Sequence, residues 1–204
     1  MRLRTAVPMM LLLLLCACGA ANTGAQTPIR LRTALNESGG CSFQLNLTAD
    51  YGEYIRTFAL ACQGDVGGKT RLTVMEPELA HGITATVQGE DAQVSYEDTI
   101  LAVEDFASRR ISPMSAPFLL LRAWSEGYIQ STGMDGNLEQ VHYLLGYGAQ
   151  ELEIVTWFAD SLPLRAEVSD GTGVLISCEI TDFNLDNKDD SNEPKTSEKD
   201  LGGD

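Results

Sequence analysis

Side chains that could do acid–base or nucleophilic chemistry are few in this chain. Its two histidines, His81 and His142, are far apart in sequence. No Gly-x-Ser-x-Gly elbow, phosphate-binding loop or paired metal-ligand motif occurs. We therefore predict a protein that is not an enzyme, with no catalytic residue, no metal site and no cofactor. A hydrolase that uses His142 or Asp160 is the weakest alternative. The acidic residues of turns and strand ends are expected to be solvated: Glu76, Glu78, Asp160 and Asp182.

The cysteine with the clearest predicted chemistry is Cys18. Arg2 and Arg4 precede an apolar run that ends in Leu15-Cys16-Ala17-Cys18, which has the form of a secretory signal with a bacterial lipobox. We predict cleavage before Cys18, which would carry a diacylglyceryl thioether and an N-acyl chain such as palmitate. Two or three acyl chains anchor a protein stably, so the expected location is the outer face of the bacterial cytoplasmic membrane. An ordinary signal cut elsewhere is the alternative.

Alternating apolar residues predict a first hairpin. Phe43, Leu45 and Leu47 alternate with polar residues, and Phe58 and Leu60 share one parity after the turn. A two-residue turn at Tyr51 and Gly52 would place all of these apolar side chains on one face. In that register the opposed pairs are Phe43 with Leu60, Leu45 with Phe58, Leu47 with Arg56, and Cys41 with Cys62.

The predicted opposition of Cys41 and Cys62 favours a disulfide. Directly opposed residues have Cα atoms about 4.5–5.5 Å apart, which a disulfide can span, and export would keep it oxidised. The alternative is that both are small buried thiols, as is common for cysteine. Cys178 lies between Ile176 and Ile180 and is expected to be an inert core thiol.

The apolar face of the sheet has two interpretations. It could line a cavity for an acyl chain, or it could be an ordinary core filled by the protein's own helix, which is the favoured reading. Arg56 would lie at the rim, either to bind a lipid head group or as a surface arginine. The residues concerned are Phe43, Leu45, Leu47, Phe58 and Leu60 on the wall, with Leu120, Leu121 and Trp124 above them.

The elements that would position these residues are mostly strands. A helix is expected from Thr27-Pro28 to the Gly39-Gly40 stop, with Ile29, Leu31 and Leu35 on its apolar side, and a stronger helix over 118–128 after Ser115 and Pro117. Short strands are expected at 71–75, 83–88, 93–96, 100–103, 141–145, 152–158, 162–168 and 174–180. The fold class is therefore α+β: a curved antiparallel sheet that forms a half-open β-barrel, with one main helix in its concave face.

Charge and composition exclude some functions and set the domain limits. The formal net charge of −15 argues against nucleic-acid binding. We expect a signal peptide at 1–17, a tether at 18–27, one domain at 28–183 and a disordered acidic tail at 184–204.

The phrases VMEPELAHGITATV (74–87), ISPMSAPFLLLRAWSEGYI (111–129) and LRAEVSDGTGVLISCEITDF near the end resemble the LolA-like lipoprotein superfamily. The lipid-anchored branch, the GerS-type germination lipoproteins of spore-forming bacteria, looks closest. The resemblance covers roughly 40–183 and implies a half-open antiparallel barrel with helices in its concave side. Members of the superfamily carry lipoproteins or lipids, or bind a cell-wall amidase.

Two functions follow as hypotheses. The first is a membrane-anchored protein without catalysis that binds an exported partner, such as a cell-wall amidase, in envelope or spore-cortex processing. Its sheet edge or its outer face would bind that partner, and an exposed sheet edge could also serve a homodimer. The second is a barrel that binds a lipid or acyl chain.

Overall fold

The computed structural model describes residues 26–50, 52, 55–89, 91–103 and 112–186. The predicted signal peptide, Cys18 and most of the tether lie outside the described residues, as does the tail from residue 187 onward. Tyr51, one of the two expected turn residues, is also outside them.

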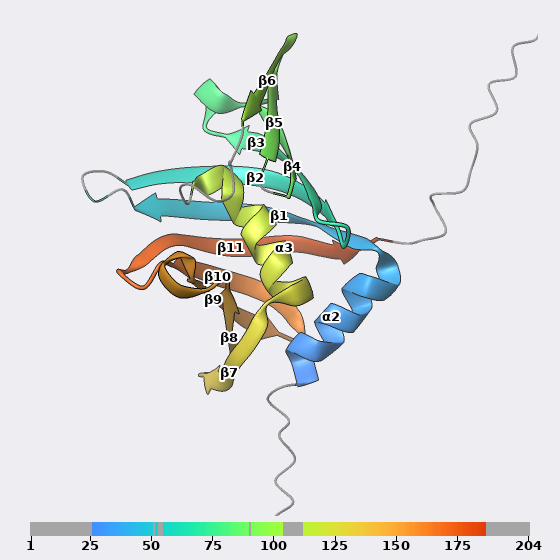
Figure 1. Ribbon diagram of the computed structural model, residues 1–204, viewed down its shortest axis with the longest axis vertical. Coiled ribbons are helices and arrows are strands. Elements are labelled where there is room, and N and C mark those ends of the chain that lie inside the picture. Colours follow the sequence, from blue (N-terminus) through green and yellow to red (C-terminus); the bar gives the residue numbers. More distant parts are fainter. Residues whose placement is uncertain (1–25, 51, 53–54, 90, 104–111, 187–204) are drawn as a thin grey trace, which may run out of the picture.

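An eleven-stranded antiparallel sheet, in the order β6-β5-β4-β3-β2-β1-β11-β10-β9-β8-β7, makes up most of the described chain (Figure 1). The first and last strands of the described chain, β1 and β11, are thus neighbours at its centre. The strands are β1 (Gly40–Asp50), β2 (Ile55–Asp65), β3 (Lys69–Glu76), β4 (Thr84–Gln88), β5 (Asp91–Tyr96), β6 (Thr99–Val103), β7 (Tyr128–Asp135), β8 (Leu138–Leu145), β9 (Leu152–Ala159), β10 (Leu162–Ser169) and β11 (Val174–Leu185).

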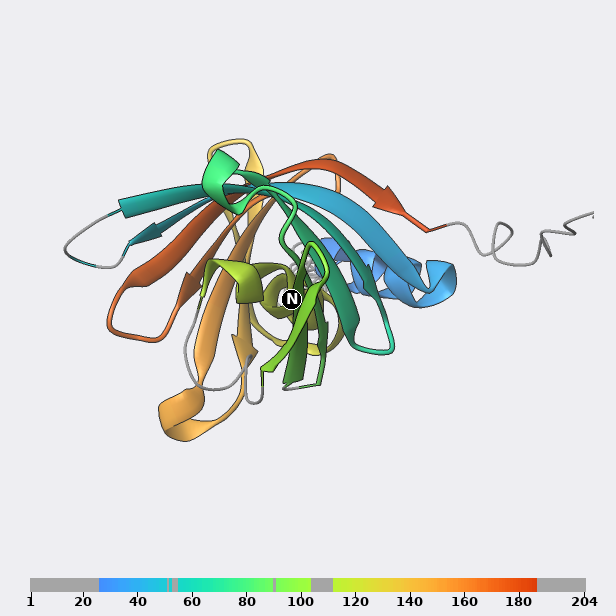
Figure 2. The ribbon, with the colours of Figure 1, turned by 90° about the horizontal axis from the view of Figure 1, so that it is seen from above.

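The sheet is curved and open, with β6 and β7 as its two edges. Figure 2 shows it arching over the two α-helices of the described chain, α2 (Gln26–Ser38) and α3 (Ala116–Glu126). Three short 3-10 turns complete the elements: η2 (Glu78–Ala80), η3 (Pro113–Ser115) and η4 (Gly148–Gln150). The predicted class, an antiparallel sheet with helix on one face, is confirmed at this level.

Both predicted helices form. On α2, Leu31 and Leu35 are buried as expected, but Ile29 is exposed, because the buried stripe includes Pro28 instead. On α3, eight of eleven residues are buried, so this helix is apolar nearly all round. Arg32 joins the two helices, since its guanidinium donates to the carbonyl oxygens of Trp124 (3.1 Å) and Gly127 (2.6 Å) at the end of α3.

The predicted register of the first hairpin is wrong by two residues. Leu45 pairs with Leu60, Leu47 with Phe58, and Ala49 with Arg56, because a longer loop follows Asp50. A shift of two residues leaves every side chain on its predicted face, so the apolar wall is preserved while the individual partners change.

A bulge in β11 completes the core. The pairing of β1 with β11 shifts by one residue between Gln44↔Thr181 and Ser42↔Asn184, and Asp182 has a φ of 50°. The extra residue reverses the alternation, so that Phe183 joins the buried face. Its ring centroid lies 6.2 Å from that of Phe43 and 5.9 Å from that of Trp124.

Three further expectations need correction. The strong helix ends at Glu126, and Tyr128 begins β7, a strand that the sequence analysis did not predict. A register shift between Pro163 and Arg165 leaves Leu162 and Leu164 exposed and Pro163 buried. The tail does not begin at residue 184, because β11 continues to Leu185 and the Asp186 amide donates to the Gly40 carbonyl.

Candidate functional site

The residues predicted to line an acyl-chain cavity come together, but as packed core. Seven of the eight are at most 3% exposed, and Phe58 is half-buried against them: Phe43, Leu45, Leu47, Leu60, Leu120, Leu121, Trp124 and Phe58. The packing is tight enough that a Cβ added at Gly64 would lie 2.3 Å from Leu121 Cδ2. The favoured reading, a core filled by the protein's own helix, is the one that the structure has.

The cysteines do not form the predicted bridge. Cys41 lies opposite Gly64 and Cys62 opposite Phe43, so the direct opposition required for a disulfide is absent. All three cysteines of the described chain, Cys41, Cys62 and Cys178, are free and buried. Burial raises the pKa of the Cys41 thiol and that of the Cys178 thiol to about 12, and it raises the pKa of Cys62 as well. These thiols are therefore protonated at neutral pH and poor nucleophiles.

The other residues considered for chemistry have local structural roles. Nδ1 of His81 donates to the carbonyl oxygen of Met75 at 2.8 Å. Nδ1 of His142 lies 2.6 Å from Oε1 of Glu153 on the neighbouring strand. Arg56 is exposed beyond Phe58 and, by strand alternation, shares its face. Within the described ranges no three His, Cys, Asp or Glu side chains could hold a metal ion.

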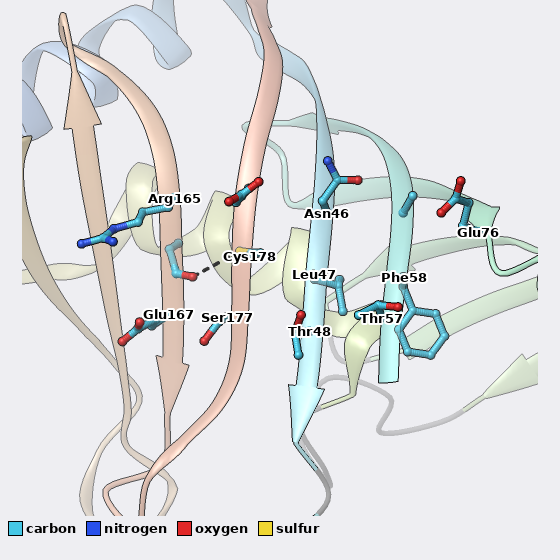
Figure 3. Close-up of a pocket in the computed structure, with 13 residues that line it drawn as sticks. Asn46, Leu47, Thr48, Thr57, Phe58, Glu76, Arg165, Glu167, Ser177 and Cys178 are labelled. Carbon is cyan, nitrogen blue, oxygen red and sulfur yellow. Dashed lines mark hydrogen bonds between the residues drawn. The ribbon is translucent and has the colours of Figure 1, made fainter. Parts of the chain in front are cut away.

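A groove of about 530 Å³ crosses the outer face of the sheet, opposite the core (Figure 3). Register places its side chains in two rows that run across the strands. The first row is Arg165, Glu179, Asn46, Ala59 and Glu76, and the second is Glu167, Ser177, Thr48 and Thr57. With strands about 4.8 Å apart, the four strands β10, β11, β1 and β2 give a groove roughly 15–20 Å long.

Small side chains make the groove hollow. Four neighbouring positions at its centre, Thr48, Thr57, Ala59 and Ser177, carry no side chain longer than threonine. The longer side chains at either end, Glu76 on β3 and Glu167 on β10, therefore stand above a floor of hydroxyl groups. Such a floor offers hydrogen bonds to a ligand that supplies donors or acceptors.

The groove has an excess of negative charge. Among the described residues that line it, the one cation is Arg165, and it is directed away from the groove: the guanidinium donates to Asp135 on β7 at 2.7 Å and lies 4.1 Å from the centre of the Trp157 ring. Trp157 donates to the same carboxylate at 2.9 Å. Within the described chain no ion pair neutralises the groove carboxylates of Glu76, Glu167 or Glu179.

This groove was not predicted from the sequence. Glu76 was expected to be a solvated strand end, and the polar positions of β1, β2, β10 and β11 were assigned no role. The alternation of polar residues predicts that they share an outer face. Which of them stand side by side depends on the register between β1 and β11, strands that are more than a hundred residues apart in sequence.

No helix of the described residues is long and apolar enough to cross a membrane. No protein-family model matches the chain, and no curated protein matches it significantly.

Several solved structures are similar in fold. A LolA superfamily protein from Nitrosomonas europaea aligns with a TM-score of 0.48 and 10% identity over 79% of this chain and 94% of its own. A putative outer membrane lipoprotein-sorting protein domain from Vibrio parahaemolyticus gives 0.43 and 10% over 82% and 93%. The structure of the CwlD amidase from Clostridioides difficile in complex with the GerS lipoprotein gives 0.39 and 11% over 76% and 92%. The solved structures that are similar to this chain thus include a LolA superfamily protein.

Proposed function

We propose that this protein is a non-enzymatic binding protein of the bacterial envelope, tethered through a lipid on Cys18, whose outer-face groove binds an exported protein partner. In this proposal the curved sheet is a half-open barrel with α3 in its concave side. The barrel is a rigid support, and its outer face is the surface that binds the partner.

The observation that supports the proposal is the set of unpaired carboxylates around a floor of small side chains. Glu76, Glu167 and Glu179 surround the hydroxyl-lined centre of the groove without a cationic partner in the described chain. Exposed carboxylates of one sign attract and orient a partner of opposite charge, and their effect is on specificity and association rate more than on affinity. The partner surface should therefore present lysine or arginine side chains.

A cell-wall amidase is the partner class that the sequence resemblance suggests, with a role in cell-envelope or spore-cortex processing. A lipid on Cys18 would hold this chain at the outer face of the cytoplasmic membrane, where such an enzyme passes or works. The binding protein would supply position and no chemistry of its own.

The alternative, an acyl chain in the concave face, requires α3 to leave its place. Leu120, Leu121 and Trp124 fill that space and are at most 3% exposed. Displacing them would expose three large apolar side chains, each worth about 1.5–3 kcal/mol of burial. Lipid that co-purifies with the full chain and is retained by a variant with a reversed groove charge would favour this alternative.

The test is site-directed photo-crosslinking in the native cells. A photoreactive amino acid replaces Thr57 in the groove of the full-length chain, or Thr172 in the exposed β10–β11 turn as a control. We expect crosslinks to an exported protein from Thr57 and not from Thr172. Glu167→Lys combined with Glu179→Lys should abolish them, whereas the exposed Glu78→Lys with Glu151→Lys, which makes the same charge change elsewhere, should not. Equal crosslinking from both positions, or crosslinks that survive the groove reversal, would contradict the proposal.

A further inference from the structure

The edge strand β6 is apolar and exposed. Among the described strands it pairs with β5 alone, and it forms one end of the sheet. Ile100 is 72% exposed and Leu101 is 62% exposed, on a strand that contains no charged residue. Proteins usually protect such edges with charges, prolines or bulges, because a free edge recruits other strands. An unprotected apolar edge therefore needs an explanation.

The geometry of the β5–β6 hairpin identifies the free backbone groups. Tyr96 pairs with Thr99 across the two-residue turn Glu97-Asp98, so these two residues exchange both of their hydrogen bonds. Because bonded and non-bonded pairs alternate along an antiparallel ladder, Leu101 and Val103 also bond to β5. The N–H and C=O groups of Ile100 and Ala102 consequently point outward, toward the free edge.

The charges around β6 indicate what kind of strand it can accept. Glu97 and Asp98 form the exposed turn that precedes the strand. A second strand placed along β6 would meet this acidic turn near one of its ends. A second copy of this chain, with its net charge of −15, would be repelled, whereas a segment with lysine or arginine at that end would be attracted.

We infer that β6 binds an extended segment of a partner protein by strand addition, and that this segment has alternating apolar residues next to a basic end. Main-chain bonds to Ile100 and Ala102 give affinity, and the acidic turn at Glu97-Asp98 selects the basic end. The inference rests on the proposed protein-binding function but assigns a second surface, at the edge of the sheet and separate from the outer-face groove.

The experiment uses the full chain, purified from membranes in detergent, and a fluorescent synthetic peptide with alternating valine and threonine between pairs of lysines. A matched peptide has glutamates in place of the lysines. Fluorescence anisotropy should show binding of the lysine peptide and binding at least about tenfold weaker for the glutamate peptide. Hydrogen exchange should slow at the amides of Ile100 and Ala102 when the lysine peptide is bound. Failure of the lysine peptide to bind, or equal binding of both peptides, would overturn the inference.

Two variants make the test specific. Ala102→Pro removes an outward-facing N–H and no bond to β5, so the protein should keep its melting temperature and lose peptide binding. If that variant fails to fold, Glu97→Lys with Asp98→Lys serves instead, and it should reverse the preference between the two peptides. Unchanged binding by a folded Ala102→Pro variant, or unchanged preference in the lysine variant, would refute the inference. A dimer of the wild-type chain that Ala102→Pro dissociates would assign the edge to a second copy and refute it as well.

A variant that removes one of the two binding surfaces should leave binding at the other unchanged. The groove variant Glu167→Lys with Glu179→Lys should bind the lysine peptide as the wild type does, and Ala102→Pro should keep the Thr57 crosslink. Loss of peptide binding in the groove variant would show that the edge is not an independent site.

Discussion

The indole nitrogen of Trp124 donates a hydrogen bond to the hydroxyl oxygen of Thr156, 3.1 Å away, and neither residue is exposed. The bond joins the middle of the chain to β9 and fixes the position of α3 on the sheet. Because both groups are removed from water, loss of either partner leaves the other unsatisfied.

Thr156→Val should therefore destabilise the fold. The valine has nearly the same shape, so the expected cost is that of the orphaned indole N–H, about 1–3 kcal/mol in the free energy of unfolding. Urea unfolding followed by tryptophan fluorescence measures it. Thr57→Val, at an exposed position of β2, should change the midpoint little; an equal loss in both variants would show that the buried bond is not the cause.

A second prediction concerns the bulge at Asp182. Its φ of 50° suits glycine and is unfavourable for a β-branched residue. Asp182→Val should cost about 1–2 kcal/mol, and Asp182→Gly should cost less, although it loses the hydrogen bond from Gln44 Nε2. Glu179→Val, at a regular position of the same strand, is the control. If the melting temperature of Asp182→Val equalled or exceeded that of Asp182→Gly, the bulge conformation at Asp182 would be contradicted.

A third prediction concerns Gly64 on β2, which lies against Leu121 of α3. A Cβ at this position would lie 2.3 Å from Leu121 Cδ2, so Gly64→Ala should force the helix outward at a cost of about 1–3 kcal/mol. The same substitution at Gly133, where no heavy atom lies within 4 Å, should not destabilise through contact. Measured melting temperatures compare the two. In a Leu121→Ala background, Gly64→Ala should cost little further stability, and an undiminished cost there would show that the clash is not the cause.

The buried thiol of Cys178 should make the unfolding free energy depend on pH. Burial raises the pKa of Cys178 from 9.0 to about 12, so the folded state holds the proton more tightly than the unfolded chain does. The stability that this provides is complete below about pH 9 and is lost as the pH rises toward 12. The unfolding free energy of the wild type should therefore fall more between about pH 8 and pH 10.5 than that of Cys178→Ala. Parallel decreases would show that Cys178 does not contribute.

The predicted anchor can be tested independently of the fold. Cells fed a clickable palmitate analogue should label the wild-type chain and Cys16→Ser, but not Cys18→Ser. Labelling of Cys18→Ser, or its absence in the wild type, would contradict a lipid on Cys18.

The sequence predicted most of the sheet because alternation is local. Phe43, Leu45 and Leu47 mark a buried face whatever their partners are, and the final hairpin follows the same rule. Two kinds of feature were not predictable. Register depends on loop length, so the pairing of Cys41 was wrong by two residues and the disulfide with it. Bulges need no sequence signal, so Phe183 and Leu164 exchanged faces with their neighbours.

The missed strand β7 has a related cause. Its residues are mostly exposed at the sheet edge, so Ile129 and Thr132 show no sustained apolar alternation. The outer groove was not predicted because its rows join strands from opposite ends of the chain, and the pairing of such strands leaves no local pattern in the sequence. Local patterns predict which way a side chain faces, and only the assembled sheet determines which residues it meets.

The central pairing of β1 with β11 has a consequence for biosynthesis. A chain still emerging from the ribosome already contains β1 but lacks β11, so the middle of the sheet closes only after the strands between them have been made. Truncation before residue 174 would leave β1 and β10 as two facing open edges. Shortened products of this gene should therefore aggregate or be degraded rather than accumulate as a smaller folded body.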